Sequence, residues 1–148
     1  MRRIADLLLF LAIMTAPGVS LAENQEVVYP AKMSKADIRG EIFARPDMKQ
    51  EDHGKGNTTL SVTTLKSSDE KFFTGMYRSG GEREEYKDKP YGVDEFMYFL
   101  EGSVTLTSAD GAVQVVNAGE AVTIPKEWKG IWESNGYTKI WVIYSNAD

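Results

Sequence analysis

The pattern of hydrophobic and polar positions changes character near residue 58. From there on, short runs of β-branched and apolar residues alternate with polar ones at a period of two, which is typical of half-buried β-strands. Glycine-containing breaks separate the runs, and Asp110-Gly111 is a strong hairpin signal because both residues tolerate a positive φ angle. The strands that this pattern predicts cover residues 59–65, 72–77, 94–100, 103–108, 113–116, 121–124 and 139–144.

Helical periodicity is almost absent from this part of the chain. The pattern therefore predicts an all-β fold, an antiparallel jelly-roll β-barrel that occupies residues 58–148. We expect Gly102, Gly111 and Gly119 to lie in turns between strands. Gly80-Gly81 and the charged run 82–89 predict an exposed loop.

Residues 23–57 form a polar, turn-rich arm that precedes the barrel. Ser34 is a suitable N-cap for a short helix that begins at the next residue. We expect the arm to lie across the barrel or to pair with a neighbouring subunit. Because open sheet edges must be paired or covered, we also expect a homodimer.

The first 22 residues have the features of a secretory signal peptide. Arg2-Arg3 provides a positive start, residues 7–16 are apolar, and Ser20-Leu21-Ala22 offers the small-x-small pattern that signal peptidase cleaves. The apolar run is shorter than the roughly 20 residues that span a bilayer. The sequence therefore predicts a periplasmic or secreted protein with no membrane attachment after cleavage.

Composition excludes several classes of chemistry. The chain of 148 residues contains no cysteine, which removes disulfides, thiol nucleophiles and zinc–thiolate sites. Its formal net charge of −5, without a basic cluster, argues against nucleic acid and anionic membranes as partners. We expect a small-molecule ligand as the partner instead.

The spacing of several residues resembles the motifs of the cupin superfamily. Gly102 follows Glu95 by seven positions, as in the first cupin motif, and Gly119 and Pro125 match the start of the second. Within the superfamily the chain is similar to the branch typified by the ureidoglycine aminohydrolase-like cupin domain. The segments that carry this likeness are Asp94-Glu95-Phe96, Leu100-Glu101-Gly102, Pro125 and Gly130-Ile131-Trp132-Glu133. The resemblance covers about residues 58–144 and implies a barrel that commonly holds a metal.

Most of the metal ligands that the resemblance implies are missing. Counting back from Glu95, the two histidine positions fall on Lys89 and Tyr91, or on Asp88 and Pro90, and the later histidine position falls on a glycine. A transition metal needs about three protein ligands in a fixed geometry. We therefore predict no metal ligand set and no cofactor, with a weakly held divalent metal as the alternative.

Glu95 is the candidate catalytic residue, because the resemblance places its side chain inside the barrel. Alternation puts Met97 and Phe99 on the same face, and such apolar surroundings disfavour a charged carboxylate and suit it to general acid or base catalysis. The alternative is an ion pair that keeps the carboxylate charged and structural. The candidate cations for that pair are Lys89, Arg78 and Lys126.

Aromatic side chains with a polar group are suited to the mouth of such a barrel, where they bind small polar rings. The predicted ligand-binding residues are Tyr77, Lys89, Tyr91, Glu95 and Trp128. Trp132 and Trp141 are predicted to be packing residues.

Three functions are compatible with these features. The first is a secreted binding module for a small polar metabolite, sugar-like or ureide-like, without a tightly held metal. The second is a metal-independent or weakly metal-dependent isomerase, lyase or hydrolase that uses Glu95. The third is a structural protein whose barrel is filled by Met97, Phe99 and Ile124. A cavity with well-placed polar groups would favour the first two.

Overall fold

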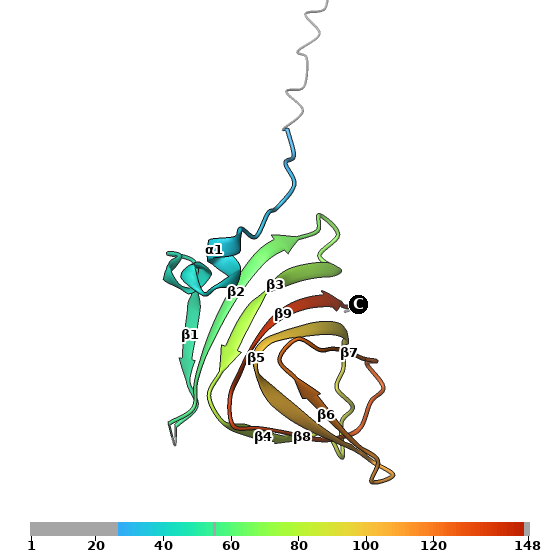
Figure 1. Ribbon diagram of the computed structural model, residues 1–148. Helices are drawn as coiled ribbons and strands as arrows, with labels where there is room; N and C mark the ends of the chain where they lie inside the picture. The colour runs from blue at the N-terminus through green and yellow to red at the C-terminus, as the bar shows by residue number, and fades with distance from the viewer. Residues whose placement is uncertain (1–26, 55, 147–148) are drawn as a thin grey trace, which may run out of the picture.

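The chain folds into one antiparallel sheet that curls into a half-barrel (Figure 1). This computed structural model describes residues 27–54 and 56–146; the predicted signal peptide lies outside the described residues. The strand order is β1-β2-β3-β9-β5-β8-β4, and β6 and β7 also pair with β5. The predicted all-β, antiparallel jelly-roll class is therefore confirmed.

The described residues form nine strands and two short helices. The helices are α1 (Lys35–Ile38) and the 3-10 helix η1 (Glu41–Ala44). The strands are β1 (Lys49–Asp52), β2 (Thr58–Lys66), β3 (Phe72–Ser79), β4 (Glu82–Glu85), β5 (Asp94–Ser108), β6 (Val113–Asn117), β7 (Ala121–Ile124), β8 (Gly130–Ser134) and β9 (Tyr137–Tyr144). None of the described helices is long or apolar enough to cross a membrane.

Strand β5 belongs to both halves of the curled sheet. Its first part pairs with β7 and β9, and its second part pairs with β6 and β8. The register shifts between Phe99 and Glu101, and a shift of this kind exchanges the two faces of a strand. The buried positions are accordingly odd before the shift and even after it: Glu95, Met97 and Phe99, then Val104 and Leu106.

The predicted turn at Gly102 is wrong, because the chain bends there within one continuous strand. Gly102 has a φ of +71°, and a Cβ at this position would lie 2.0 Å from the carbonyl oxygen of Gly136. Only glycine permits this close approach of β5 to the start of β9. Gly111 and Gly119 do lie between strands, at the β5–β6 and β6–β7 connections, as predicted.

Two other predictions for this region also need correction. The charged run 82–89 is not entirely a loop, because its first four residues form β4, which pairs with β8. Strand β8 was absent from the predicted set as well. The run Glu82-Arg83-Glu84-Glu85 has low strand propensity, which is why it was predicted to be a loop. Backbone pairing with β8 nevertheless holds these residues in a strand, with alternate side chains on opposite faces.

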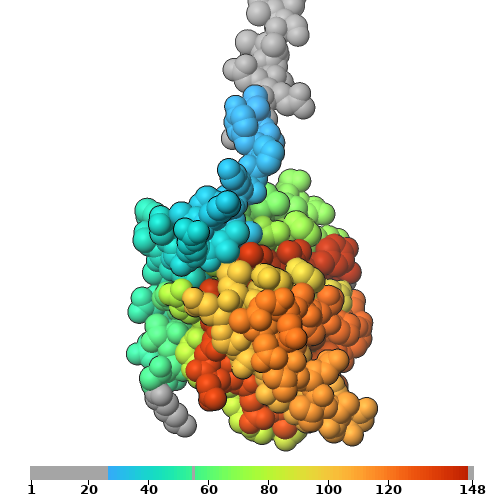
Figure 2. All heavy atoms as spheres, in the orientation of Figure 1, coloured from blue at the N-terminus to red at the C-terminus, as the bar shows by residue number. Residues whose placement is uncertain are grey.

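The polar arm packs on the convex face of the sheet. Ser34 and Asp37 form a capping box at the start of α1, as expected for the predicted helix. Ile42 and Phe43 of η1 are buried against β2 and β3, and the guanidinium of Arg78 lies 4.7 Å from the ring centroid of Phe43. Figure 2 shows the arm in cyan seated against the body of the protein.

The main core fills the concave side of the sheet. Its fully or nearly buried members are Met97, Phe99, Val104, Leu106, Val116, Ile124, Trp132, Tyr137 and Trp141. Because the arm covers the opposite face, the middle of the sheet has a core on each side. Successive residues of β9 are consequently buried together, as in Tyr137-Thr138-Lys139.

Candidate functional site

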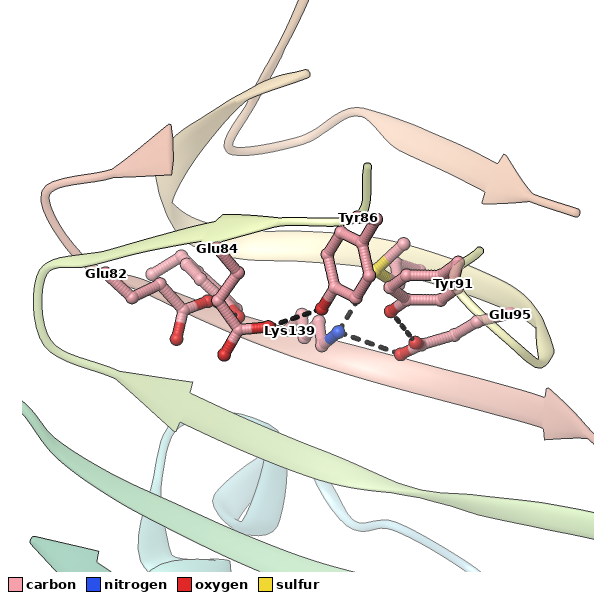
Figure 3. Close-up of polar contacts among 8 residues, drawn as sticks. Glu82, Glu84, Tyr86, Tyr91, Glu95 and Lys139 are labelled. Atoms are coloured by element: carbon pink, nitrogen blue, oxygen red, sulfur yellow. Dashed lines mark hydrogen bonds and ion pairs between the residues drawn. The ribbon is translucent and has the colours of Figure 1, made fainter. Parts of the chain in front are cut away.

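A cavity of about 260 Å³ lies on the concave side of the half-barrel, bordered by β2, β3, β4, β5, β8 and β9. Strand register explains its composition: Ser61, Tyr77 and Lys139 are direct neighbours across β2, β3 and β9, and all three line the cavity. Figure 3 shows the polar side chains that converge here. The barrel interior is therefore packed in part and hollow in part.

An ion pair lies within this cavity. The Nζ of Lys139 on β9 is 2.8 Å from Oε1 of Glu95 on β5, and both side chains are buried. The same Nζ lies 3.0 Å from the sulfur of Met97. Three aromatic rings also surround the ammonium, with centroids 5.2–5.8 Å away: Trp132, Tyr77 and Tyr137. Carboxylate and ring faces together compensate for the loss of water around the charge.

Each of the three carboxylates that line the cavity accepts a hydrogen bond from a tyrosine. The hydroxyl of Tyr91 donates to Oε2 of Glu95, and the hydroxyl of Tyr86 donates to Glu84. The third pair joins β9 to β4, where the hydroxyl of Tyr137 donates to Oε1 of Glu82 at 2.6 Å. These bonds fix the carboxylates in place and leave further lone pairs available to a ligand.

The tyrosines of the site stay neutral at physiological pH. Burial raises the pKa of Tyr77 to about 12. Burial, and then the neighbouring carboxylates, raise the pKa of Tyr86, Tyr91 and Tyr137 still further. These hydroxyls are therefore hydrogen-bond donors, and none of them is suited to act as a phenolate base near neutral pH.

The structure brings together three of the predicted site residues, Tyr77, Tyr91 and Glu95. Lys89 is exposed and does not line the cavity. Trp128 lies behind the wall, 5.9 Å from Tyr86 and 6.3 Å from Tyr91 between ring centroids. The predicted ligand contacts of these residues stay predictions.

The predicted ion-pair partners of Glu95 are wrong. Its partner is Lys139, whereas Arg78 lies on the opposite face of the sheet, above the arm. Sequence reasoning placed Lys139 in a strand and gave it no role. One signal was available: Lys139 alternates with Tyr137 and Trp141, so a lysine occupies the inward face of an otherwise apolar strand.

Sequence reasoning also missed Ser61, Tyr137 and Ile143, which line the cavity from predicted strands or next to one, and Glu82, Glu84 and Tyr86, which fall in the run predicted to be a loop. A strand of alternating glutamates is hard to distinguish from a solvated surface segment without knowledge of its partner strand. The cavity positions of the glutamates follow from the pairing of β4 with β8, which sets Glu84 opposite Trp132.

The two tryptophans predicted to be packing residues are buried, and both also line the cavity. The indole of Trp141 lies across β3 at Gly75, where a Cβ would come within 2.5 Å of it. The Nε1–H of Trp132 is buried and has no hydrogen-bond partner among the described residues. An unpaired buried donor of this kind is uncommon in native proteins.

The residues present do not fit the metal that a cupin barrel commonly holds. Within residues 27–54 and 56–146, no three His, Cys, Asp or Glu side chains are grouped so as to hold a metal ion. Both oxygens of Glu95 are already engaged, one by the ammonium of Lys139 and one by Tyr91, which stands at a histidine position of the motif.

Comparisons with known proteins agree with this fold. Residues 87–139 match the family model of the EutQ-like cupin domain. The solved EutQ protein of Clostridium difficile is 19% identical, with a TM-score of 0.52 over 67% of this chain and 78% of that one. A putative ethanolamine utilization protein Q from Salmonella typhimurium is 15% identical, with a TM-score of 0.52 over 66% and 77% of the two chains.

A protein of unknown function from Rhizobium leguminosarum is 20% identical, with a TM-score of 0.54 over 80% of this chain and all of that one. These identities establish a shared fold alone. No curated protein matches the chain significantly. The finer likeness to the ureidoglycine aminohydrolase-like branch is not confirmed by the family match. The chain is therefore similar to the EutQ-like cupin domain over residues 87–139, and it shares its fold with these solved structures.

Proposed function

We propose that this protein binds a small polar metabolite in the cavity of its half-barrel, without a tightly held metal. The observation that carries the proposal is the cavity itself, a space of about 260 Å³ into which the Lys139–Glu95–Tyr91 cluster projects. Binding sites for small molecules are typically apolar hollows with a few fixed polar groups. A volume slightly below the roughly 300–1,000 Å³ of drug-sized sites points to a small ligand.

The lining supports a sugar-like or ureide-like ligand. The rings of Tyr77, Trp132 and Tyr137 present apolar surface for a small ring, and the carboxylates accept hydrogen bonds from hydroxyl or amide groups. A sugar and a ureide each carry hydrogen-bond donors and acceptors close together, and these could pair with the carboxylates and the ammonium of the cavity lining.

An enzyme that uses Glu95 is the second candidate, and one observation favours it. A carboxylate, an ammonium and a neutral tyrosine hydroxyl meet at Glu95 inside the cavity, so a proton acceptor and two donors are close together. Isomerase, lyase or hydrolase chemistry on a bound metabolite would follow from this arrangement. A structural role is less favoured, because the cavity persists beside the buried Met97, Phe99 and Ile124.

We further propose export to the periplasm or the exterior, and a homodimer. The export proposal rests on the N-terminal sequence, and localisation of the full chain with a fused reporter would test it. Phe96 and Tyr98 leave apolar surface exposed on the outer face of β5, which supports association of two copies. Light scattering of the purified protein would reveal a monomer if the dimer proposal is wrong.

A ligand screen with a cavity-filling variant tests the binding function. Sugars and ureides are screened by thermal shift and confirmed by calorimetry against the wild type and Ser61→Leu, whose larger side chain projects into the cavity. Thr63→Leu, two residues along the same strand, is the control because Thr63 is exposed and does not line the cavity. We expect binding to the wild type and control only. Equal binding to Ser61→Leu would place the ligand elsewhere.

A further inference from the structure

Resting on the proposed homodimer, we infer that two copies of this chain join at the free edge of β6, in a register centred on Gln114. Strand β6 pairs with β5 along one side, and no described strand pairs with its other side. An open edge presents unpaired N–H and C=O groups that a strand of a second molecule can join. The alternation of the β5–β6 ladder determines which residues present them.

The backbone groups of Val113 and Val115 point away from β5. The amide of Ala118, the first residue after β6, donates to the carbonyl of Gly102 on β5. The bonds of an antiparallel ladder recur at every second residue, so the even-numbered residues of β6 bond to β5 and the odd-numbered ones face the free edge. Within the part of the chain that the structure describes, no strand pairs with that edge.

The length of the free edge sets the register of a second copy. Asn117 also faces this edge, but its N–H donates to Oε2 of Glu120 at 2.7 Å and is not available to a partner. The residues that remain, 113–115, read Val-Gln-Val in both directions. A two-fold axis through Gln114 sets Val113 of each copy opposite Val115 of the other. The outward N–H and C=O groups of both valines are then paired in both copies.

The side chains of the edge also suit a second copy. Val113 and Val115 are 60% and 54% exposed, and their contact across the two-fold axis would remove apolar surface from water. On the opposite face the amides of the two Gln114 side chains can hydrogen-bond one another. A hollow beside the edge, where β6 meets β7, can receive side chains of the second copy; it is lined by Gln114, Val115, Val116, Glu120, Ala121 and Val122. Figure 2 shows the β6 region, in orange, at the surface of the protein.

Charge distinguishes β6 from the two ends of the sheet. Strand β1 has two acidic residues and one lysine, and β4 has three glutamates and one arginine, so two copies would repel one another at either strand. Charged side chains are one means by which proteins prevent edge strands from joining. Strand β6 contains no charged residue. Strand β7 is also uncharged, but its exposed residues, Ala121 and Thr123, offer less apolar surface than two valines.

The outer face of β5, where Phe96 and Tyr98 are exposed, is the competing surface for the dimer. The backbone groups of that part of β5 are already paired with β7 and β9, so side chains alone would hold a second copy there. At β6 both the backbone and the side chains are available, which favours β6 as the interface.

Charges placed on the edge test both the surface and the register. Val113→Lys/Val115→Lys sets like charges opposite one another and should raise the Kd of the dimer at least about tenfold, measured by analytical ultracentrifugation. In the matched control Val113→Lys/Val115→Glu, each lysine lies opposite the glutamate of the other copy, so the dimer should be retained. Both positions are exposed within one chain, so we expect native folding of both variants, checked by circular dichroism.

Hydrogen exchange measured by NMR tests the interface in the wild type. The amides of Val113 and Val115 should exchange at least about tenfold more slowly above the Kd of the dimer than below it, because only a second copy covers them. The amide of Asn117 is the internal reference, since Glu120 already accepts its hydrogen bond within the same chain.

Each contrary result has its own meaning. A wild type that is monomeric at about 100 μM would overturn both the inference and the proposed homodimer. If the dimer persists in both β6 variants and is lost in Phe96→Ser/Tyr98→Ser, the homodimer stands and the β6 interface is wrong. Equal weakening in both β6 variants would contradict the register centred on Gln114. Ligand binding in the cavity is independent of all these outcomes.

Discussion

Glu95 and Lys139 form a buried ion pair across β5 and β9, with Oε1 and Nζ separated by 2.8 Å and side-chain exposures of 5% and 7%. Removal of one partner leaves the other charge buried and uncompensated. We therefore expect Glu95→Gln to lower the free energy of unfolding by about 3–5 kcal/mol, measured by urea denaturation. The matched control Glu133→Gln breaks an exposed pair with Arg83 and should cost about 0–1 kcal/mol.

A double-mutant cycle completes this prediction. Lys139→Met removes the cation with little change in side-chain length, and the double variant with Glu95→Gln should be more stable than the sum of the two single losses implies. If Glu95→Gln were as stable as the wild type, the ion pair between Glu95 and Lys139 would not contribute to the free energy of unfolding.

The buried tyrosines predict a loss of stability at high pH. Their pKa values are raised above the ordinary 10.0, so below pH 10 they are neutral in both the folded and the unfolded states and stability is fully present. Above pH 10 the unfolded chain loses these protons first, and the free energy of unfolding falls by up to about 1.4 kcal/mol per pH unit for each such tyrosine. Tyr137→Phe should reduce that slope by one tyrosine's share in denaturant titrations. An identical slope would contradict the assignment.

Gly102 is predicted to tolerate substitution less well than the turn glycine Gly111. Both have positive φ angles, so alanine at either position should cost about 1–2 kcal/mol in backbone strain. At Gly102 the new methyl group would additionally meet a carbonyl oxygen of Gly136, whereas Gly111 has open space around it. Thermal melts of Gly102→Ala and Gly111→Ala should therefore show the larger drop for Gly102→Ala. Equal drops would mean that the strands can separate there at little cost.

Chelation should leave the melting temperature of the protein unchanged. Glu95 is engaged by Lys139 and Tyr91, so metal binding at this carboxylate would require both contacts to be broken. Calorimetry with and without a strong chelator, together with elemental analysis, provides the measurement. A clear fall that a divalent ion reverses would contradict this prediction.

Local pattern was sufficient to predict much of the fold. Alternation placed Glu95, Met97 and Phe99 on one face of a strand, the resemblance turned that face into the barrel, and Asp110-Gly111 predicted the β5–β6 hairpin. The same rule failed at Gly102, because a bulge that exchanges the faces of a continuous strand has the same local sequence features as a turn between two strands.

The candidate site was less predictable, because its groups meet only through strand pairing. Lys139 lies 44 positions from Glu95 in sequence, and only the register of β9 against β5 brings them together. Likewise, Glu84 faces the cavity because β4 pairs with β8, a contact that its own charged sequence does not indicate. The resemblance to the first cupin motif therefore identified Glu95 as a candidate, but it could not identify the partners of Glu95.

The central place of β9 has a consequence for how the protein assembles. This strand lies between β3 and β5, although it follows both by many residues in the chain. Until residues 137–144 join, β3 and β5 each have an open edge, and the ammonium that neutralises Glu95 is absent. Pairings between segments so distant in sequence form slowly, and the incomplete sheet meanwhile exposes edges that other chains can join. We therefore expect the half-barrel to be completed in one step. When β9 pairs with β3 and β5, it joins the two parts of the sheet, adds Tyr137 and Trp141 to the main core and brings the ammonium of Lys139 to Glu95.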